Sequence, residues 1–371
     1  MASLLPLVDS IIGHLRRRRP RPKKPSGVLL ISAGGLGDTV LFTVVLPRLL
    51  RLAQPDEDIT ILLRADAAKM SFLFPPEITV EAIDFGRLLK DFGYRHRAQT
   101  ALHDRGYRLV VATDHLRHPW LDEALAFAAD APETVAMVAR HWPKHERRLT
   151  ANERRFDRLF ESGPNLTDKV MRLGRFADWL LGEETPPQHV VLPDNVLPTA
   201  AKLDLPTVFV QPFSAVREKQ SPVELYRRIF AALPAEWRIV ITGAPDDLER
   251  NADFQALLDP PRVSFDDSTF AELLPRLLSA RFVVSVDTAL MHLSAAAGVP
   301  TLCLASAAYV GEIVPYDDAV RPANAHAVHT PMPCQGCLGH CSLPTENGMF
   351  PCVARLDADR ILAEVGRLVA A

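Results

Sequence analysis

Short apolar runs alternate with longer amphipathic segments from Gly27 onward, and this alternation predicts the elements of the chain. The apolar runs are rich in Val and Ile, which favour strands, and the segments between them repeat apolar residues at helical spacing. Strand, helix, strand in this order predicts a parallel, doubly wound α/β sheet. In the first half we expect strands at 28–33, 59–63, 78–83, 108–114 and 134–139, with helices that include 39–52, 116–129 and 167–181.

A stretch with five prolines and no helical period, residues 183–206, interrupts this pattern and favours an interdomain linker. The alternation then resumes, so two Rossmann-like domains should face a cleft between the carboxyl ends of their sheets. The expected division is an N-terminal tail 1–26, a first domain 27–185, a linker 186–206 and a second domain 207–371. The second half should hold strands at 207–212, 237–243, 262–265, 281–287 and 300–305, helices beginning near Pro222, Asp246, Thr269 and Thr288, and a final helix within 357–371.

Composition places the chain among soluble globular proteins, with 48% hydrophobic and 23% charged residues in 371. No apolar run approaches the roughly 20 residues that cross a bilayer. A secretory signal carries its positive charges before its apolar stretch, whereas here the apolar segment 4–15 precedes the basic segment 16–24. We therefore expect a cytoplasmic protein.

The net charge of −3 conceals an uneven distribution of charge along the chain. The segment 16–24 holds seven of the 42 basic residues, so the remainder carries 35 basic against 45 acidic residues. No basic face suited to nucleic acid is evident in that remainder. An apolar segment beside a basic cluster suits the surface of an anionic membrane, while a solvated tail is the alternative reading.

The sequence ISAGGLGDTVLF, residues 31–42, leaves an expected strand through three glycines and continues at Asp38. Such loops bring backbone N–H groups close to phosphates at helix starts. Asp38 could cap the following helix, or it could act as a general base at the mouth of a cleft. The dinucleotide fingerprint fits poorly, because Val40 stands at its third small position and Arg64 stands where an acid should end the second strand.

Two stretches of the second half complete a set of motifs. VVSVDTALMHLSAAAGVPTLCLA, residues 283–305, runs from a strand through Asp-Thr into a helix of small residues, and REKQSPVELYRRI occupies 217–229. With the glycine loop, these stretches resemble the heptosyltransferase family of glycosyltransferases (glycosyltransferase family 9), whose members show Ser-Leu-Gly-Asp, Lys-x-Trp-Pro and Asp-Thr-Gly-Leu-Met-His in this order. The resemblance covers most of residues 27–371 and implies two Rossmann-like domains of the GT-B architecture.

The resemblance also implies roles for individual residues. Asp38 corresponds to the proposed general base, and Lys219 to the lysine that neutralises the diphosphate of the nucleotide sugar. That ammonium and the helix N-terminus near Thr288 could hold the leaving diphosphate without a metal ion. The residues expected at the nucleotide-sugar site are Gly35, Gly37, Ser214, Gly243, Asp287, Thr288, Ala289, Leu290, Met291 and His292, the last with a buried core position as its alternative.

Three positions depart from the family pattern. Ala289 adds a methyl group where the family has glycine, Gln220-Ser221 replaces the pair that ends in Trp, and Pro47 replaces an earlier proline in the first helix. These departures concern the fit of donor and acceptor rather than the fold.

Four of the five cysteines, Cys334, Cys337, Cys341 and Cys352, crowd into a loop-like region after the last expected strand. In a cytoplasmic chain, a Cys-x-x-Cys pair with two further thiols favours a metal over disulfides, and four thiolates suit structural zinc or a mononuclear iron. Free thiols are the alternative. Cys303 reads as a buried small side chain.

Taken together, the motifs imply an inverting glycosyltransferase that needs no cofactor for catalysis. It would move a heptose or related sugar from ADP-heptose or a similar nucleotide sugar to a lipopolysaccharide-type saccharide acceptor, as a cytoplasmic or peripheral membrane enzyme. A transferase directed at a protein, as in the autotransporter-modifying relatives that the cysteines resemble, is one alternative. A non-catalytic scaffold with the same fold is another.

Overall fold

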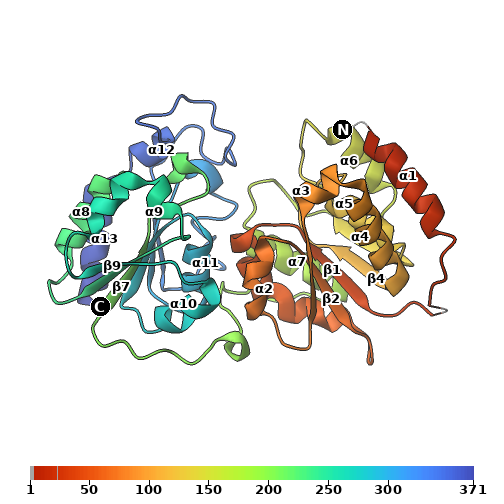
Figure 1. Ribbon diagram of the computed structural model, residues 1–371, viewed down its shortest axis with the longest axis horizontal. Helices are drawn as coiled ribbons and strands as arrows, with labels where there is room; N and C mark the ends of the chain where they lie inside the picture. The colour runs from red at the N-terminus through yellow and green to blue at the C-terminus, as the bar shows by residue number, and fades with distance from the viewer. Residues whose placement is uncertain (1–3, 23) are drawn as a thin grey trace. The chain divides into compact units, whose positions relative to one another are not determined.

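The computed structural model describes residues 4–22 and 24–371, which divide into two compact units (Figure 1). Unit 1 comprises Met1–Asn165 and Arg172–Pro186, and unit 2 comprises Leu166–Met171 and Pro187–Ala371. The chain therefore passes between the units three times. The predicted tail 1–26 lies in unit 1, apart from residues 1–3 and 23, which are outside the described residues.

Unit 1 is built on a six-stranded parallel sheet with the order β3-β2-β1-β4-β5-β6. Its near-continuous apolar strands are typical of a sheet covered on both faces, and Figure 1 shows α2 on one side of it and α4 and α5 on the other. The strands are β1 (Val28–Ser32), β2 (Ile59–Arg64), β3 (Thr79–Ile83), β4 (Leu109–Ala112), β5 (Glu133–Met137) and β6 (Arg158–Phe160). The helices are α1 (Leu5–Arg16), α2 (Leu36–Leu49), α3 (Phe85–Lys90), α4 (Phe92–Arg105), α5 (Asp122–Ala129), α6 (Glu146–Glu153) and α7 (Lys169–Leu181), with 3-10 turns at Leu50–Leu52 and Ala67–Leu73. The first three residues of α7 belong to unit 2.

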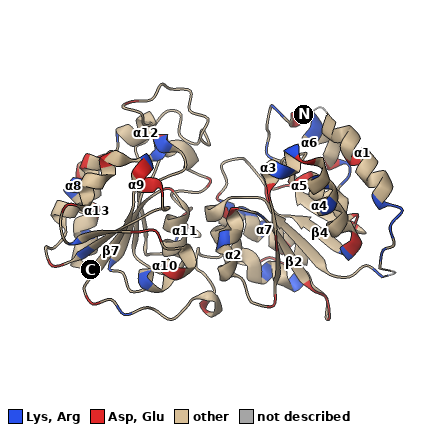
Figure 2. Ribbon diagram, viewed as in Figure 1, with Lys and Arg blue, Asp and Glu red and all other residues tan. Residues whose placement is uncertain are grey.

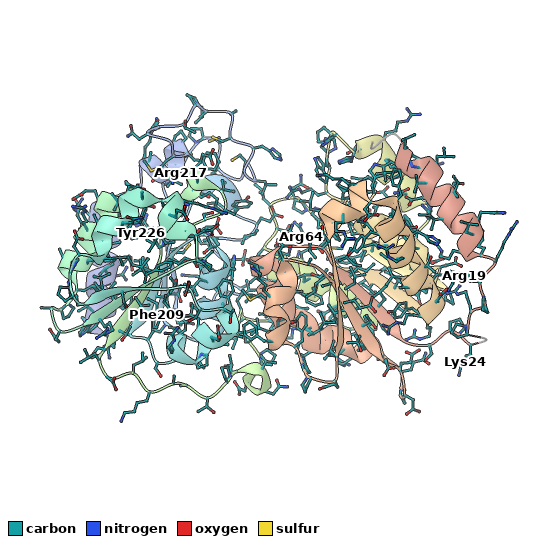
Figure 3. The ribbon with its side chains drawn as sticks, viewed as in Figure 1. Arg19, Lys24, Arg64, Phe209, Arg217 and Tyr226 are labelled. Carbon is teal, nitrogen blue, oxygen red and sulfur yellow. The ribbon has the colours of Figure 1, made fainter. Side chains whose placement is uncertain are left out.

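Unit 2 repeats this architecture with the strand order β12-β11-β10-β7-β8-β9, again with every pairing parallel. Phe209 and Tyr226 lie in its interior, the first on a central strand and the second on α8 (Figure 3). The strands are β7 (Thr207–Gln211), β8 (Arg238–Thr242), β9 (Val263–Asp266), β10 (Phe282–Val286), β11 (Thr301–Leu304) and β12 (Ala325–Val328). The helices are α8 (Val223–Ala232), α9 (Asp247–Arg250), α10 (Phe270–Leu277), α11 (Ala289–Ala296), α12 (Pro351–Ala354) and α13 (Ala358–Ala370), with 3-10 turns at Asp194–Val196, Arg217–Lys219, Ala252–Leu258 and Ala307–Tyr309.

Strand order reverses once in each sheet, and these reversals place the predicted functional residues. In unit 1 the sequence-first strand β1 lies between β2 and β4, and in unit 2 the first strand β7 lies between β8 and β10. Ligands of open α/β sheets bind outside the carboxyl ends of the strands at such a switch point. The glycine loop follows β1, and Asp287 follows β10, so each belongs to a switch point.

The ten expected strands are present with bounds shifted by one or two residues, whereas β6 and β12 are two short edge strands that the pattern did not predict. The apolar N-terminal segment forms the helix α1, and α3, α4, α6 and α12 are additional helices. The proline-rich stretch 183–206 contains only the 3-10 turn Asp194–Val196. Within the described part of the chain, no helix has the length and apolarity that spanning a membrane requires.

Candidate active site

The glycine loop of unit 1 leads directly into α2, which begins at Leu36 rather than at the expected Thr39. Asp38 is therefore the third residue of the helix. The N-cap is Gly35, so the interpretation of Asp38 as the N-cap is wrong in position. Its Oδ2 accepts a hydrogen bond of 2.7 Å from the backbone N–H of Gly35. This contact fixes the orientation of a half-buried carboxylate at the positive end of α2.

Gly34 allows the loop to approach Asp38. A Cβ atom at position 34 would lie 2.4 Å from the Cβ of Asp38 and 2.9 Å from its Oδ2, closer than real Cβ contacts. A Cβ atom at Gly35 would lie 3.6 Å from the same oxygen, which is ordinary contact. Position 34 therefore requires glycine for steric reasons, whereas Gly35, which was predicted at the nucleotide-sugar site, does not.

Two charged residues that the sequence did not assign to the site, Asp114 and Arg64, lie at the same edge of the sheet. Asp114 follows β4, and its Oδ2 accepts a hydrogen bond of 2.6 Å from the N–H of Ala33, where the glycine loop begins. Arg64 ends β2 and pairs with Asp66. The pKa of Arg64 is raised mainly by Asp66, with smaller contributions from Asp38 and Asp114 (Figure 3 labels Arg64). Their places at adjacent strand ends are the signal that could have identified them.

His115 and His118, which follow β4, are neutral at physiological pH. Burial and, secondly, the nearby charge of Arg172 lower the pKa of His115 to about 4, and its Nδ1 lies 3.0 Å from the carbonyl oxygen of Val138. Burial and then His145 lower the pKa of His118 to about 4. Neither imidazole supplies a positive charge for an anionic ligand at neutral pH.

In unit 2, Lys219 and Asp287 form a closely held ion pair. The Nζ of Lys219 lies 2.8 Å from Oδ2 of Asp287 and donates to the Asp287 carbonyl oxygen at 3.0 Å. Both side chains are largely buried, with exposed fractions of 11% and 7%. The same ammonium lies 4.7 Å from the centre of the Tyr309 ring, a cation–π contact. A lysine and an aspartate predicted for one site are thus brought together by adjacent strands.

The helix α11 begins immediately after Asp287 with Thr288 as its N-cap. The Thr288 hydroxyl does not cap the helix and instead donates to Oε1 of Gln211, at the end of β7, at 3.2 Å. Ala289 is the first residue of α11, and the Lys219 ammonium lies beside this helix start because it contacts Asp287, two residues earlier. A positive helix end next to an ammonium is suited to an anionic ligand.

Two further predicted residues lie along the same edge. The carbonyl oxygen of Ser214 accepts from Nε2 of Gln220 at 3.0 Å, so the glutamine that replaces a family residue holds the loop after β7. Gly243 follows β8, and a Cβ atom there would lie 2.7 Å from the Phe213 ring and 2.9 Å from Oδ2 of Asp247. Glycine is therefore required at 243 by its own unit, whatever ligand it meets.

Three predicted residues of α11 have buried side chains. Leu290 and Met291 belong to the apolar interior, and His292 is 4% exposed with its Nδ1 2.7 Å from the hydroxyl oxygen of Tyr316. This contact corresponds to the buried alternative for His292. Any contribution of these residues to ligand binding through their backbone stays a prediction, as do the roles of Gly35, Gly37 and the other site residues.

The four clustered cysteines line a single cavity of about 10 Å³, together with residues such as Met332 and Phe350. All four are free thiols. Across residues 4–22 and 24–371, no three His, Cys, Asp or Glu side chains converge as a metal-binding group. Four thiols suit a soft metal by their chemistry and border one small cavity, but they do not converge on a common point in this structure, so the metal stays a prediction.

The cysteine segment also contacts the loop that carries Lys219. The N–H of Phe350 donates to the carbonyl oxygen of Glu218 at 2.9 Å. A Cβ atom at Gly339 would lie 3.0 Å from the Tyr309 hydroxyl, so the segment passes close to the ring beneath the Lys219 ammonium. Nothing in the sequence signals these contacts.

Residues 183–339 match the model of glycosyltransferase family 9 (heptosyltransferase). The chain carries a glycosyltransferase family 9 domain. This match confirms the resemblance for the two motifs of the second half and supports a glycosyltransferase, while the glycine loop with Asp38 lies outside the matched residues. The family 9 domain includes Lys219, Asp287 and the whole of α11.

Solved structures agree on the fold. The family 9 glycosyl transferase of Veillonella parvula DSM 2008 is 16% identical with a TM-score of 0.65, covering 93% of this chain and 97% of its own. Escherichia coli heptosyltransferase WaaC with ADP-2-deoxy-2-fluoro heptose is 18% identical with a TM-score of 0.65, covering 92% and 99%. The iron-containing dodecameric heptosyltransferase TibC of enterotoxigenic E. coli H10407, in complex with ADP-D-beta-D-heptose, is 13% identical with a TM-score of 0.51, covering 94% and 77%. No curated protein matches the sequence. The two-sheet α/β fold of the GT-B heptosyltransferases is thereby confirmed.

Proposed function

We propose that the protein transfers a heptose or a closely related sugar, with inversion, from ADP-heptose or a similar nucleotide sugar to a saccharide acceptor of the lipopolysaccharide type. The observation that carries this proposal is the Lys219–Asp287 pair at the start of α11, inside the family 9 domain. The WaaC structure contains ADP-2-deoxy-2-fluoro heptose and the TibC structure contains ADP-D-beta-D-heptose, which supports the choice of donor.

In the proposed reaction, the negative charge that develops on the leaving diphosphate is stabilised by the Lys219 ammonium and by the N–H groups of α11. The carboxylate of Asp38 accepts the proton of the acceptor hydroxyl. The acceptor oxygen attacks the anomeric carbon as the bond from that carbon to the diphosphate oxygen breaks. Attack from the face opposite the leaving group inverts the configuration at that carbon. The protein's own groups supply the charge for this step, so no cofactor is proposed for catalysis.

A transfer assay tests the proposal directly. Purified protein is incubated with ADP-heptose and a lipid-linked core oligosaccharide, and the product is analysed for a new glycosidic bond by mass spectrometry and for its anomeric configuration by NMR. A panel of other nucleoside diphosphate sugars serves as the control for donor choice. Retention of configuration, or turnover only with an unrelated donor, would contradict the proposal.

A second candidate, transfer to a protein, is favoured by the cysteine cavity, because iron-containing TibC shares the fold. The two candidates separate when radiolabelled ADP-heptose is offered with lipid-linked saccharide and with polypeptide acceptors in parallel. Label in the polypeptide alone would replace the first candidate with the second.

We further propose that Cys334, Cys337, Cys341 and Cys352 hold one zinc or iron ion with a structural role. The metal would fix the segment that bonds to Glu218 and borders Tyr309, and so would steady the loop of Lys219. Metal analysis should find close to one ion per chain, and Cys337→Ser with Cys341→Ser should lower that content and weaken ADP binding. Gly366→Ala is the control, since position 366 is an exposed part of α13 where an added Cβ atom meets nothing within 4 Å. Metal-free protein with full ADP affinity would overturn the assignment.

The acceptor would be met at the inner surface of the cytoplasmic membrane, which makes the protein a peripheral enzyme. The N-terminal helix α1 supports this location, because large apolar side chains on it are exposed.

A further inference from the structure

Helix α1 has two apolar faces, and only one of them packs against the rest of unit 1. Leu5 and Ile12 are 1% and 5% exposed, and the helix packs on α4 at the outside of the unit (Figure 1). Packing inside unit 1 therefore explains some of the apolar residues in the N-terminal segment, but not all of them.

Charged contacts hold this helix in place. Asp9 accepts hydrogen bonds of 2.6 Å from both Nε and an Nη of Arg95, whose side chain is 0% exposed. Oδ1 of Asp9 also accepts from Nε2 of Gln99 at 2.8 Å. Because Arg95 is buried, loss of Asp9 would leave a buried charge without its carboxylate. The helix is thus an integral part of unit 1.

The other face presents four large apolar side chains to solvent. Leu4, Leu7, Ile11 and Leu15 are 50%, 61%, 53% and 49% exposed. Spacings of three and four residues place them on one side of the helix, along about 16 Å of its axis. Other apolar side chains of similar exposure, for example Val191 and Leu205, occur singly.

Basic residues follow the exposed apolar face directly. Arg17 and Arg18 are exposed, and within the described residues neither forms an ion pair, whereas Arg19 and Arg21 pair with Asp104 and Asp130. Figure 2 shows the concentration of positive charge on the segment after α1, and Figure 3 labels Arg19 and Lys24 on it. Apolar side chains beside free arginines complement both the acyl boundary and the head groups of an anionic bilayer.

We propose that Leu4, Leu7, Ile11 and Leu15, with Arg17 and Arg18, form a surface that docks on anionic lipid bilayers. A second copy of the chain fits this surface less well, because one helix face of this length provides far less than the roughly 800 Å² per partner of a stable interface. This surface rests on the proposed function in one respect, because it would bring the enzyme to a lipid-linked acceptor. The assay below contains neither donor nor acceptor, so the two proposals can fail separately.

Vesicle sedimentation with the full chain tests the docking surface. The wild-type protein should bind vesicles of phosphatidylcholine with phosphatidylglycerol at least about tenfold more strongly than vesicles of phosphatidylcholine alone. The triple variant Leu7→Gln, Ile11→Gln, Leu15→Gln should bind the anionic vesicles at least about tenfold less strongly. Arg17→Gln with Arg18→Gln should reduce binding by about fivefold per charge. Val191→Gln with Leu205→Gln, which removes the same kind of exposed side chain elsewhere, should bind as the wild type does.

Circular dichroism and thermal unfolding establish that the variants are folded, as expected for changes at exposed positions. Equal sedimentation of the wild type and the triple variant would overturn the proposal, and so would equal binding to neutral and anionic vesicles. Light scattering tests whether a second copy of the chain occupies this face instead. A wild-type dimer that the triple variant converts to a monomer, without vesicle binding by either, would assign the face to self-association and overturn the proposal as well.

Discussion

The ammonium of Lys219 lies 2.8 Å from the carboxylate of Asp287, 68 residues further along the chain and at the end of a neighbouring strand. The carboxyl ends of β7 and β10 bring the two residues together at the switch point of the second sheet. An anionic ligand placed here meets one positive and one negative side chain, which have opposite effects on its binding.

Lys219→Met should weaken ADP binding by at least about tenfold and reduce transfer by about a hundredfold or more, because the positive charge facing the diphosphate is lost. Asp287→Asn should not weaken ADP binding to the same extent, since it removes a negative charge close to the phosphates. Calorimetric titration with ADP compares the two variants. Equal losses in both would contradict the assignment of the ammonium to the diphosphate.

Asp38→Asn should reduce the rate of transfer by about a hundredfold or more while ADP affinity stays unchanged, because the amide cannot accept the proton of the acceptor. The amide oxygen can still accept from the N–H of Gly35, so the start of α2 should be preserved. The measurement is kcat at saturating donor, with ADP binding as the control. Normal turnover of this variant would exclude Asp38 as the base.

Gly34→Ala should impair transfer as well, through geometry rather than chemistry. The added methyl would lie 2.4 Å from the Cβ of Asp38, so the loop or the carboxylate must move. Gly366→Ala is the matched control, since a Cβ atom there meets nothing within 4 Å and position 366 is an exposed part of α13. The control should raise the free energy of unfolding by about 0.5–1 kcal/mol without loss of rate. Comparable activity in both variants would show that the close approach at 34 is unimportant.

Arg117→Met should destabilise unit 1 by about 3 kcal/mol or more in urea unfolding. Arg117 and Glu123 form a fully buried pair at 2.9 Å, and Nδ2 of Asn152 donates to the same carboxylate at 2.6 Å. Removing the guanidinium leaves a buried carboxylate with a single neutral partner. Combining it with Glu123→Leu should recover part of the loss, and Arg19→Met, at an exposed pair, should change little. A loss no greater than that of Arg19→Met would be inconsistent with this account.

The stability of unit 1 should also fall as the pH rises toward 8. Burial raises the pKa of Asp122 to about 8 from a usual 3.8, so the folded chain keeps a proton that the unfolded chain releases between these values. The free energy of unfolding should therefore decrease by up to about 1.4 kcal/mol per pH unit above pH 4 because of this group.

Asp122→Asn should remove that slope. Urea unfolding at pH 5, 6 and 7 measures it, and intrinsic fluorescence reports mainly on unit 1, which holds Trp120, Trp142 and Trp179 of the four tryptophans. Parallel stability curves for the wild type and the variant would show that Asp122 is not protonated in the folded state.

The β-branched runs predicted every central strand, because strands covered on both faces must be apolar along their whole length. The edge strands β6 and β12 were missed because Arg158–Phe160 contains no β-branched residue and Ala325–Val328 contains a single one. Helix α4 was missed because its sequence is polar, although Asp91 accepts from the N–H of Tyr94 at its start and Gly106 ends it with a φ of 67°. Both caps were readable signals.

At the candidate site, the motifs identified Lys219 and Asp287 separately. Their ion pair depends on the order of the strands in the sheet, which cannot be predicted from a local sequence pattern. The same holds for Asp114, whose bond to Ala33 joins neighbouring strands 81 residues apart. The role of Tyr309 beneath Lys219 could not be predicted either, because it follows from how the turn after β11 meets the loop after β7.

The assignment of Leu166–Met171 to unit 2 has a consequence for dissecting the protein. Oδ2 of Asp168 accepts from the N–H of Asp317 at 3.1 Å, and the N–H of Lys169 donates to the carbonyl oxygen of Glu312 at 2.8 Å. A fragment that starts in the proline-rich stretch 183–206 would lose these six residues and leave their partners exposed. Unit 2 is therefore not a contiguous piece of the sequence. Truncation within 183–206 should yield an incompletely packed unit, which a synthetic peptide of residues 166–171 would have to complement.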